Sequence, residues 1–154
     1  MSIKKVEDLV RGHPFFKGMR PEHIATISTC ASNVRFKPGD AIFSVDEPAN
    51  HFYLVEEGRA AVGVESEQGM ITVQTVEAGG VLGWAWLFPP YRRNFDARCI
   101  EPIKAYAFDG ACIRKKCEGD NVLGYALMKH FSALMIERLK ATRLQLLDMV
   151  APGG

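Results

Sequence analysis

The chain has 154 residues, of which 47% are hydrophobic and 24% are charged, with a formal net charge of +1. A chain of about 150 residues can bury a full core without metals or disulfides, and these proportions exclude a disordered or fibrous protein. Because 19 Lys and Arg residues are nearly balanced by 18 Asp and Glu residues, direct DNA binding through the phosphates is not expected.

The four cysteines are Cys30, Cys99, Cys112 and Cys117. A core of this size needs no disulfide framework, and no second Cys or His pair lies at zinc-finger spacing. We therefore expect free thiols, a reducing cytoplasmic setting and no metal. The N-terminus lacks the apolar run of a signal peptide. No run of about 18 apolar residues occurs, so no membrane association is expected.

Residues 1–33 combine short amphipathic pieces with helix breakers. Pro14 and Pro21 both disfavour helix at the residue that precedes them. Pro21 suits the first turn of a new helix, which would place Ile24 and Ile27 on one face. Two or three short helices are expected here.

Residues 34–109 alternate short strand patterns with turns rich in Gly, Pro, Asp and Asn. The Pro38-Gly39 pair marks one turn, and residues 56–59 (EEGR) read as a hairpin turn. Such closely spaced strands indicate an antiparallel sandwich or barrel. The expected strands are 41–43, 52–55, 60–64, 71–76, 96–100 and 103–108.

Residues 110–150 are predicted to form the C-terminal helices. The stretch from 120 to 150 contains no Pro and one Gly, and it is rich in Leu, Met, Ala, Lys and Arg, which is typical of helix. Helices, then strands, then a long helix make residues 1–154 a single α+β domain.

Five short motifs of this chain occur together in a known family. They are 13–19 (HPFFKGM), 36–43 (FKPGDAIF), 47–49 (EPA), 52–58 (FYLVEEG) and 83–87 (GWAWL), the last followed by Arg92 and Arg93. In this order and spacing the chain resembles the cyclic nucleotide-binding domain of the catabolite activator protein superfamily, from about residue 13 to 150. The resemblance implies an antiparallel jelly-roll barrel between the N-terminal helices and the long C-terminal helix.

The resemblance also implies a phosphate site. In the family, a Gly-Glu-Leu-Ala motif supplies backbone amides, and an arginine about ten residues later meets the cyclic phosphate through its planar fork of donors. Gly83 and Ala85 match the motif, Arg93 falls at the arginine position, and Asn94 stands where Ser or Thr is common. Arg92 is a further candidate. Alternatively, the two arginines form a solvated pair beside the Pro-Pro turn.

Trp84 stands where the family has the glutamate that accepts a ribose hydroxyl. Losing a charge-assisted hydrogen bond costs roughly 1.5–3 kcal/mol, and the indole could fill the sugar end of the pocket. The aromatic residues Trp84, Trp86, Phe88 and Tyr91 either line a ligand pocket or pack as core or lid. Asp96 lies close to Arg93 in sequence, although strand alternation should point it to the other side.

The function expected from these residues is a regulatory sensor. It would bind a cyclic nucleotide (cAMP or cGMP) or a related anionic small molecule and signal through its C-terminal helix to an unknown effector protein. The alternative is a degenerate domain, closed by Trp84, that serves as a protein–protein scaffold. No enzyme is expected, because nucleophile elbows and phosphate loops are missing from the sequence. No helix-turn-helix is expected either, since it would need several tens of residues after Val150.

A row of mostly apolar residues follows the C-terminal helix in steps of four and three. Two positions per heptad over three heptads are typical of a parallel coiled coil. The row predicts a homodimer through this helix, unless the same face packs on the barrel. Its members, called the seam below, are Met128, Ser132, Met135, Leu139, Thr142, Leu146 and Met149.

A second apolar row on the same helix is available to pack on the barrel. It comprises Leu123, Leu127, Phe131 and Leu134, and it is expected to fade at Arg138. The family resemblance agrees with pairing through this helix, and it implies that Thr142 lies near the base of a bound nucleotide.

Overall fold

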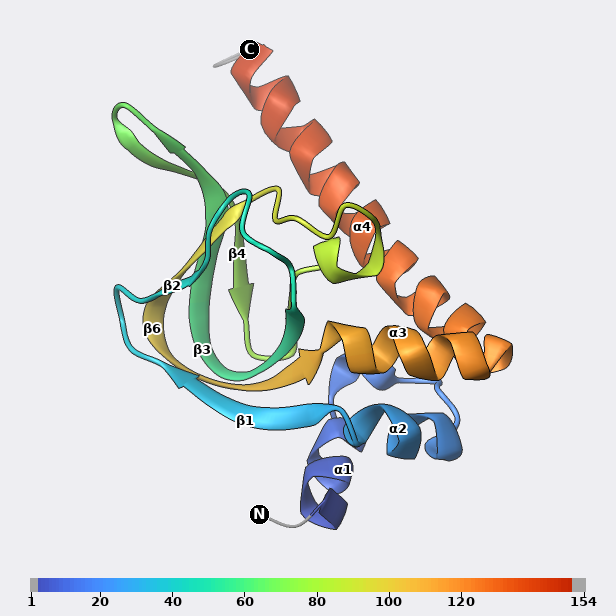
Figure 1. Cartoon of the computed structure of the whole chain (residues 1–154). Helices are drawn as coiled ribbons and strands as arrows, with labels where there is room; N and C mark the ends of the chain where they lie inside the picture. The colour runs from blue at the N-terminus through green and yellow to red at the C-terminus, as the bar shows by residue number, and fades with distance from the viewer. Residues whose placement is uncertain (1–2, 151–154) are drawn as a thin grey trace.

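The computed structural model describes residues 3–150, in which the N-terminal and C-terminal helices pack together beside a curled antiparallel sheet (Figure 1). The predicted α+β jelly-roll class is confirmed. In chain order the elements are α1 (Ile3–Arg11), η1 (Pro14–Phe16), α2 (Pro21–Ser28), β1 (Ala31–Phe36), β2 (Ala41–Phe43), β3 (His51–Ser66), β4 (Gly69–Glu77), β5 (Val81–Leu82), η2 (Ala85–Leu87), β6 (Asp96–Asp109), α3 (Gly110–Gly119) and α4 (Asn121–Val150).

α2 begins at Pro21, as expected, and the short helix η1 begins at Pro14. Pro21 occupies the first turn of α2, and both Ile24 and Ile27 are buried. The ring of His13 caps η1: its Nδ1 accepts from the Phe15 amide at 3.2 Å, and its Nε2 lies 3.2 Å from the Val55 carbonyl oxygen. His13 therefore joins the first helices to the sheet.

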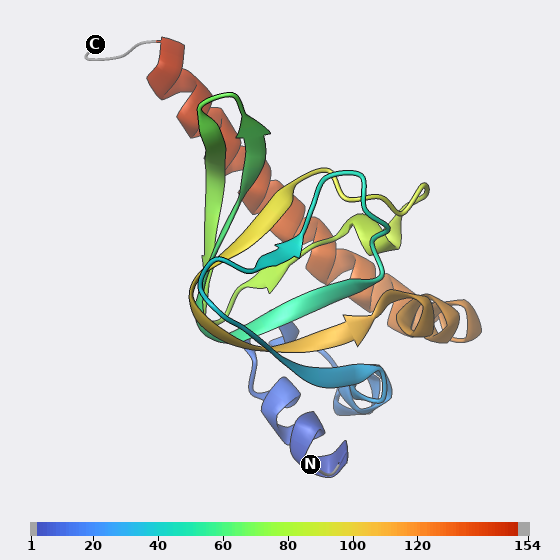
Figure 2. The same ribbon diagram turned by 60° about the vertical axis from the view of Figure 1, so that its left-hand side comes forward.

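The strands run in the order β1-β6-β3-β4, with β2 on β6 and β5 on β3, and every pairing is antiparallel. Figure 2 shows how strongly the sheet curls. The predicted barrel is not closed, because β1 and β4 end the strand order of the described residues without pairing with each other. The sheet is an open roll.

The prediction of a hairpin turn at residues 56–59 is wrong. β3 continues through it and stays paired with β6 from His51 opposite Asp109 to Gly63 opposite Asp96, with register shifts between residues 55 and 60. Gly58 has φ +99°, and a side chain there would collide with the backbone of Pro102. The glycine therefore bends a continuous strand. β1 also begins at residue 31, ahead of the boundary predicted at residue 34.

Two hydrophobic clusters stabilise the fold. The first joins the helices to the outside of the roll around Phe52, whose ring lies 4.7 Å from Phe108 and 5.0 Å from both Trp86 and Phe131, between ring centroids. Trp86 is therefore core, whereas Phe88 is exposed. The second cluster fills the inside of the roll and supplies the apolar wall of the pocket described below.

The expectation of four free thiols is wrong. Cys30 and Cys112 form a disulfide, with their Cα atoms 5.9 Å apart, while Cys99 and Cys117 are free. The Asp109 amide donates to the Cys30 carbonyl oxygen at 3.0 Å, so the end of β6 brings α3 to the start of β1. Disulfides are typical of oxidising compartments, and the cytoplasmic setting stays a prediction.

Two further observations concern residues 3–150. None of their helices combines the length and the apolar character needed to cross a membrane. No group of three or more His, Cys, Asp or Glu side chains in this part of the chain is arranged to hold a metal ion.

Candidate functional site

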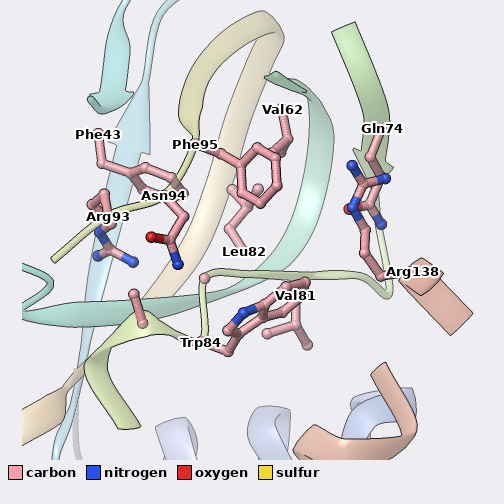
Figure 3. A pocket seen from close by; sticks show the side chains of 12 residues that line it. Phe43, Val62, Gln74, Val81, Leu82, Trp84, Arg93, Asn94, Phe95 and Arg138 are labelled. Carbon is pink, nitrogen blue, oxygen red and sulfur yellow. The ribbon is translucent and has the colours of Figure 1, made fainter. Parts of the chain in front are cut away.

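One pocket lies inside the roll, between β3, β5, the segment after β5, the loop before β6, and α4. About 450 Å³ of space lies between its atoms when open solvent is included, and about 40 Å³ of this is enclosed enough to hold water-sized molecules. The lining side chains are shown in Figure 3. They belong to Phe43, Val62, Gln74, Val81, Leu82, Gly83, Trp84, Ala85, Arg93, Asn94, Phe95 and Arg138.

Arg93 is the most deeply buried polar group of the pocket, with 4% of its surface exposed. Its Nη2 donates to the His51 carbonyl oxygen at 2.5 Å, and its guanidinium carbon lies 4.0 Å from the centroid of the Phe43 ring. Nε and Nη1 have no hydrogen-bond partner among the described residues. A buried guanidinium therefore keeps two donor atoms unused in the pocket.

The backbone of Arg93 is held by the loop between β2 and β3. Its amide donates to the Glu47 carbonyl oxygen, and its own carbonyl accepts from the Asp46 amide, both at 2.9 Å. Burial lowers the pKa of Arg93, against the opposite influence of Tyr53 and Glu47. The fold thus holds this cation in place at an electrostatic cost.

Gly83 lies directly against Arg93. It has φ +90°, and a Cβ atom at this position would collide with Arg93 Nη1. Glycine is required here for two reasons, the left-handed backbone conformation and the close approach of the guanidinium. Asn94 is exposed at the mouth and Ala85 is half-buried.

Trp84 forms one wall of the pocket. Its half-buried indole packs against the first hydrophobic cluster and lies beside Val81, along the side of the pocket opposite Phe95 (Figure 3). A cavity remains next to the indole. No carboxylate occurs among the twelve lining residues, whereas two arginines do, so the pocket is cationic with aromatic and aliphatic walls.

Arg138 of α4 is a charged pocket residue that the sequence analysis did not predict. The barrel-facing row was expected to fade at this position, yet 8% of Arg138 is exposed, and its Nη1 donates to the Val73 carbonyl oxygen at 2.8 Å. The signal was its spacing of seven residues from the buried Phe131, which keeps both on one helix face. A long stem lets an arginine cross an apolar wall and still place its head in a polar pocket.

Two of the predicted ligand residues do not line the pocket. Arg92 is exposed and donates to the Asp46 carbonyl oxygen at 3.0 Å, because adjacent residues of an extended segment point to opposite sides. Thr142 lies one turn beyond Arg138 and is exposed. Asp96 is buried away from the pocket, where it accepts from the Val45 and Glu65 amides at 2.9 and 3.2 Å.

The seam begins where α4 packs on the domain and continues onto the exposed C-terminal part of the helix. Met135 is half-buried against the first hydrophobic cluster, whereas Met128, Leu139, Leu146 and Met149 are exposed, Leu139 by 70% and Met149 by 76%. The C-terminal part of the predicted seam is thus uncovered in the monomer.

Residues 33–120 match the family model described as the cyclic nucleotide-binding domain. The chain belongs to this family. The match includes the pocket residues from Phe43 to Phe95 and ends before α4, so it leaves out Arg138 and the whole seam.

Relatives of this cyclic nucleotide-binding domain agree in fold. A putative cyclic nucleotide-binding protein from Geobacter metallireducens superimposes with a TM-score of 0.76 at 26% identity, covering 90% of this chain and 98% of that one. The regulatory domain of Toxoplasma gondii PKA, solved with cAMP, gives 0.73 at 18% identity over 88% of this chain and 50% of that one.

A curated relative is the CRP-like cAMP-activated global transcriptional regulator of Mycobacterium tuberculosis. It is 21% identical over 146 residues, which are 94% of this chain and 63% of the relative. The chain therefore spans less than two thirds of the length of this regulator.

Proposed function

We propose that this domain is a sensor that binds a cyclic nucleotide, with the cyclic phosphate held by Arg93 beside Gly83. The observation that carries the proposal is the guanidinium of Arg93, buried with Nε and Nη1 unpartnered. Leaving buried donors unsatisfied costs free energy, and a phosphate accepts from two guanidinium nitrogens at once. A bound phosphate would pair the charge and accept a hydrogen bond from one of these two donors.

The side chains around Arg93 have the chemistry to bind such a ligand. Gly83 lets the backbone approach the guanidinium without a side chain in between, and the lining contains no carboxylate to repel an anion. Phe95, Val62 and Leu82 provide an apolar surface on which a purine could pack. These residues bind and orient a ligand, and we propose no chemical step for them.

Trp84 removes the hydrogen-bond acceptor that the family places beside the ribose 2′-hydroxyl. An indole offers only an N–H donor, so this position cannot accept a hydrogen bond from the ribose 2′-hydroxyl. We therefore expect cAMP and 2′-deoxy-cAMP to bind with similar affinity, since the hydroxyl gains no charge-assisted hydrogen bond here. Trp84→Glu would restore discrimination in favour of cAMP.

The test is a thermal shift followed by calorimetry with cAMP and cGMP. A ligand at a hundred times its Kd should stabilise the native state by about 2.7 kcal/mol. Arg93→Ala and Arg93→Lys should both remove most of the shift, because neither retains the planar fork. Arg92→Ala is the matched control, an exposed neighbour whose loss should leave binding intact. No shift at millimolar ligand with the wild type would overturn the proposal and favour the scaffold.

We further propose that the domain pairs with a second copy through α4 and that this helix transmits ligand occupancy to an effector. The support is the uncovered apolar face after Arg138, with Leu139 and Met149 among its most exposed members. A helix that leaves such residues in water gains free energy when a partner covers them. Light scattering on the wild type and on Leu139→Glu tests this pairing.

A further inference from the structure

Arg138 is a buried cation without a counter-charge. Within residues 3–150 its guanidinium is in no ion pair; it donates to the neutral Val73 carbonyl and lies 5.5 Å from the centroid of the Phe95 ring. Burial alone lowers the pKa of Arg138. Nη1 makes its one hydrogen bond to the described residues. Because a buried charge is costly unless it is paired, the remaining donors of Arg138 are available to a ligand acceptor in the pocket.

Arg93 and Arg138 lie on opposite sides of the pocket. In Figure 3, Arg93 and Asn94 form one side, Gln74 and Arg138 form the other, and the Phe95 ring stands between them over Val62 and Leu82. If Arg93 holds the phosphate, the base extends toward Phe95 and Arg138. There an aromatic ring offers a stacking surface, and a guanidinium offers donors at its edge.

The donors of Arg138 distinguish between purine bases. A guanidinium has only N–H donors. Guanine presents two neighbouring acceptors, O6 and N7, and arginine binds them as a pair, whereas adenine presents the N7 acceptor beside an amino donor. The amino group of adenine would therefore meet the N–H donors of Arg138, and no hydrogen bond could form between them.

We propose that Arg138 reads the base and makes the pocket prefer cGMP over cAMP. The inference rests on the proposed function, since it assumes that the cyclic phosphate binds at Arg93. A bidentate contact of this kind discriminates between bases by about tenfold or more. Arg138 is then a specificity residue on α4, outside the segment that matches the family.

Calorimetry with three ligands tests the proposal on the whole chain. The ligands are cGMP, cAMP and cyclic IMP, which keeps O6 and N7 but lacks the 2-amino group of guanine. The wild type should bind cGMP and cyclic IMP with similar Kd, both about tenfold or more tighter than cAMP. Arg138→Ala should weaken the first two ligands to the level of cAMP and change the Kd of cAMP little.

Two further variants separate recognition from structure. Arg138→Lys keeps the charge but loses the fork, so it should also lose most of the preference for cGMP. Arg143→Ala removes an exposed arginine from the same helix and should keep the preference. Should Arg138→Ala fail to fold, Arg138→Lys takes its place, and a cGMP preference that is retained in Arg138→Lys would overturn the inference.

Three results would overturn the inference. Equal or tighter binding of cAMP, still lost in Arg93→Ala, would leave the proposed function standing and remove the role of Arg138. An equal loss of all three ligands in Arg138→Ala would make the arginine a structural support. Binding of none of the three by the wild type would overturn the proposed function as well.

Discussion

The two halves of α4 differ sharply although they form one unbroken helix. From Asn121 to Arg138 the helix buries Leu123, Leu127 and Phe131 against the domain. Beyond residue 138 every described residue is exposed, and the helix continues past the roll (Figures 1 and 2). Gln145 still donates to the Val73 carbonyl oxygen at 3.0 Å, although its side chain is exposed.

The contrast teaches that the two halves are helical for different reasons. The first half is stabilised by burial of an apolar face, which accounts for most helix stability in proteins. The second half depends on helix-favouring Leu, Lys, Arg and Gln residues and presents apolar side chains to water. It is the part of the chain best suited to meet a partner, and Arg138 lies at the boundary beside the pocket.

The largest effect is expected from Phe131→Ala in the packed half. The Phe131 ring lies 4.9 Å from Phe15, 5.0 Å from Phe52 and 5.3 Å from Trp86, measured between centroids. Its removal should lower the free energy of unfolding by about 3–5 kcal/mol, measured by chemical denaturation. Leu147→Ala in the exposed half is the control and should change it by less than about 0.5 kcal/mol. Similar losses at both positions would contradict the division of α4.

Reduction of the disulfide between Cys30 and Cys112 should destabilise the domain, because this bond links the start of β1 to α3. Cys30 and Cys112 are 82 residues apart in sequence, and closing so long a loop stabilises a protein by about 2–4 kcal/mol. We expect dithiothreitol to lower the free energy of unfolding by that amount. A Cys30→Ala, Cys112→Ala double variant should be equally destabilised and insensitive to the reductant. A reductant effect that persists in the double variant would implicate the other cysteines.

Leu139→Glu tests the exposed half. A homodimer through the seam would bury the new carboxylate without a partner, so light scattering at micromolar concentration should give a dimer mass for the wild type and a monomer mass for the variant. Ala141→Glu adds the same charge off the seam and should keep the dimer. A wild-type mass near 17.1 kDa would contradict the pairing.

The smallest effect concerns pH and the contacts of His13. Burial lowers the pKa of His13 from its usual 6.5, mainly by desolvation, and Nδ1 accepts a hydrogen bond that requires the neutral ring. Below pH 6.5, His13 therefore binds a proton more readily in the unfolded chain than in the folded chain. The free energy of unfolding should fall with decreasing pH in this range, by at most about 1.4 kcal/mol per pH unit. In His13→Gln the acid denaturation series should show a shallower slope, and an unchanged slope would exclude His13 as its source.

Much of the fold was predictable because its signals are local. Pro21 starts α2, residues 41–43 form β2, and the pattern from 120 to 150 gave the long helix with Leu127 and Phe131 buried. The resemblance to the family implied that Gly83 and Arg93 belong to one site, and both line the pocket.

Only the tertiary structure decided the remaining features, because they depend on residues far apart in the chain. β3 continues past Gly58 because β6 pairs with it on both sides of the bend, and Cys30 meets Cys112 because β1 and β6 bring their ends together. Arg138 reaches the pocket because α4 packs on the roll up to that residue. Sequence periodicity determined which face of α4 is apolar, but the end of that packing is set by where the roll ends.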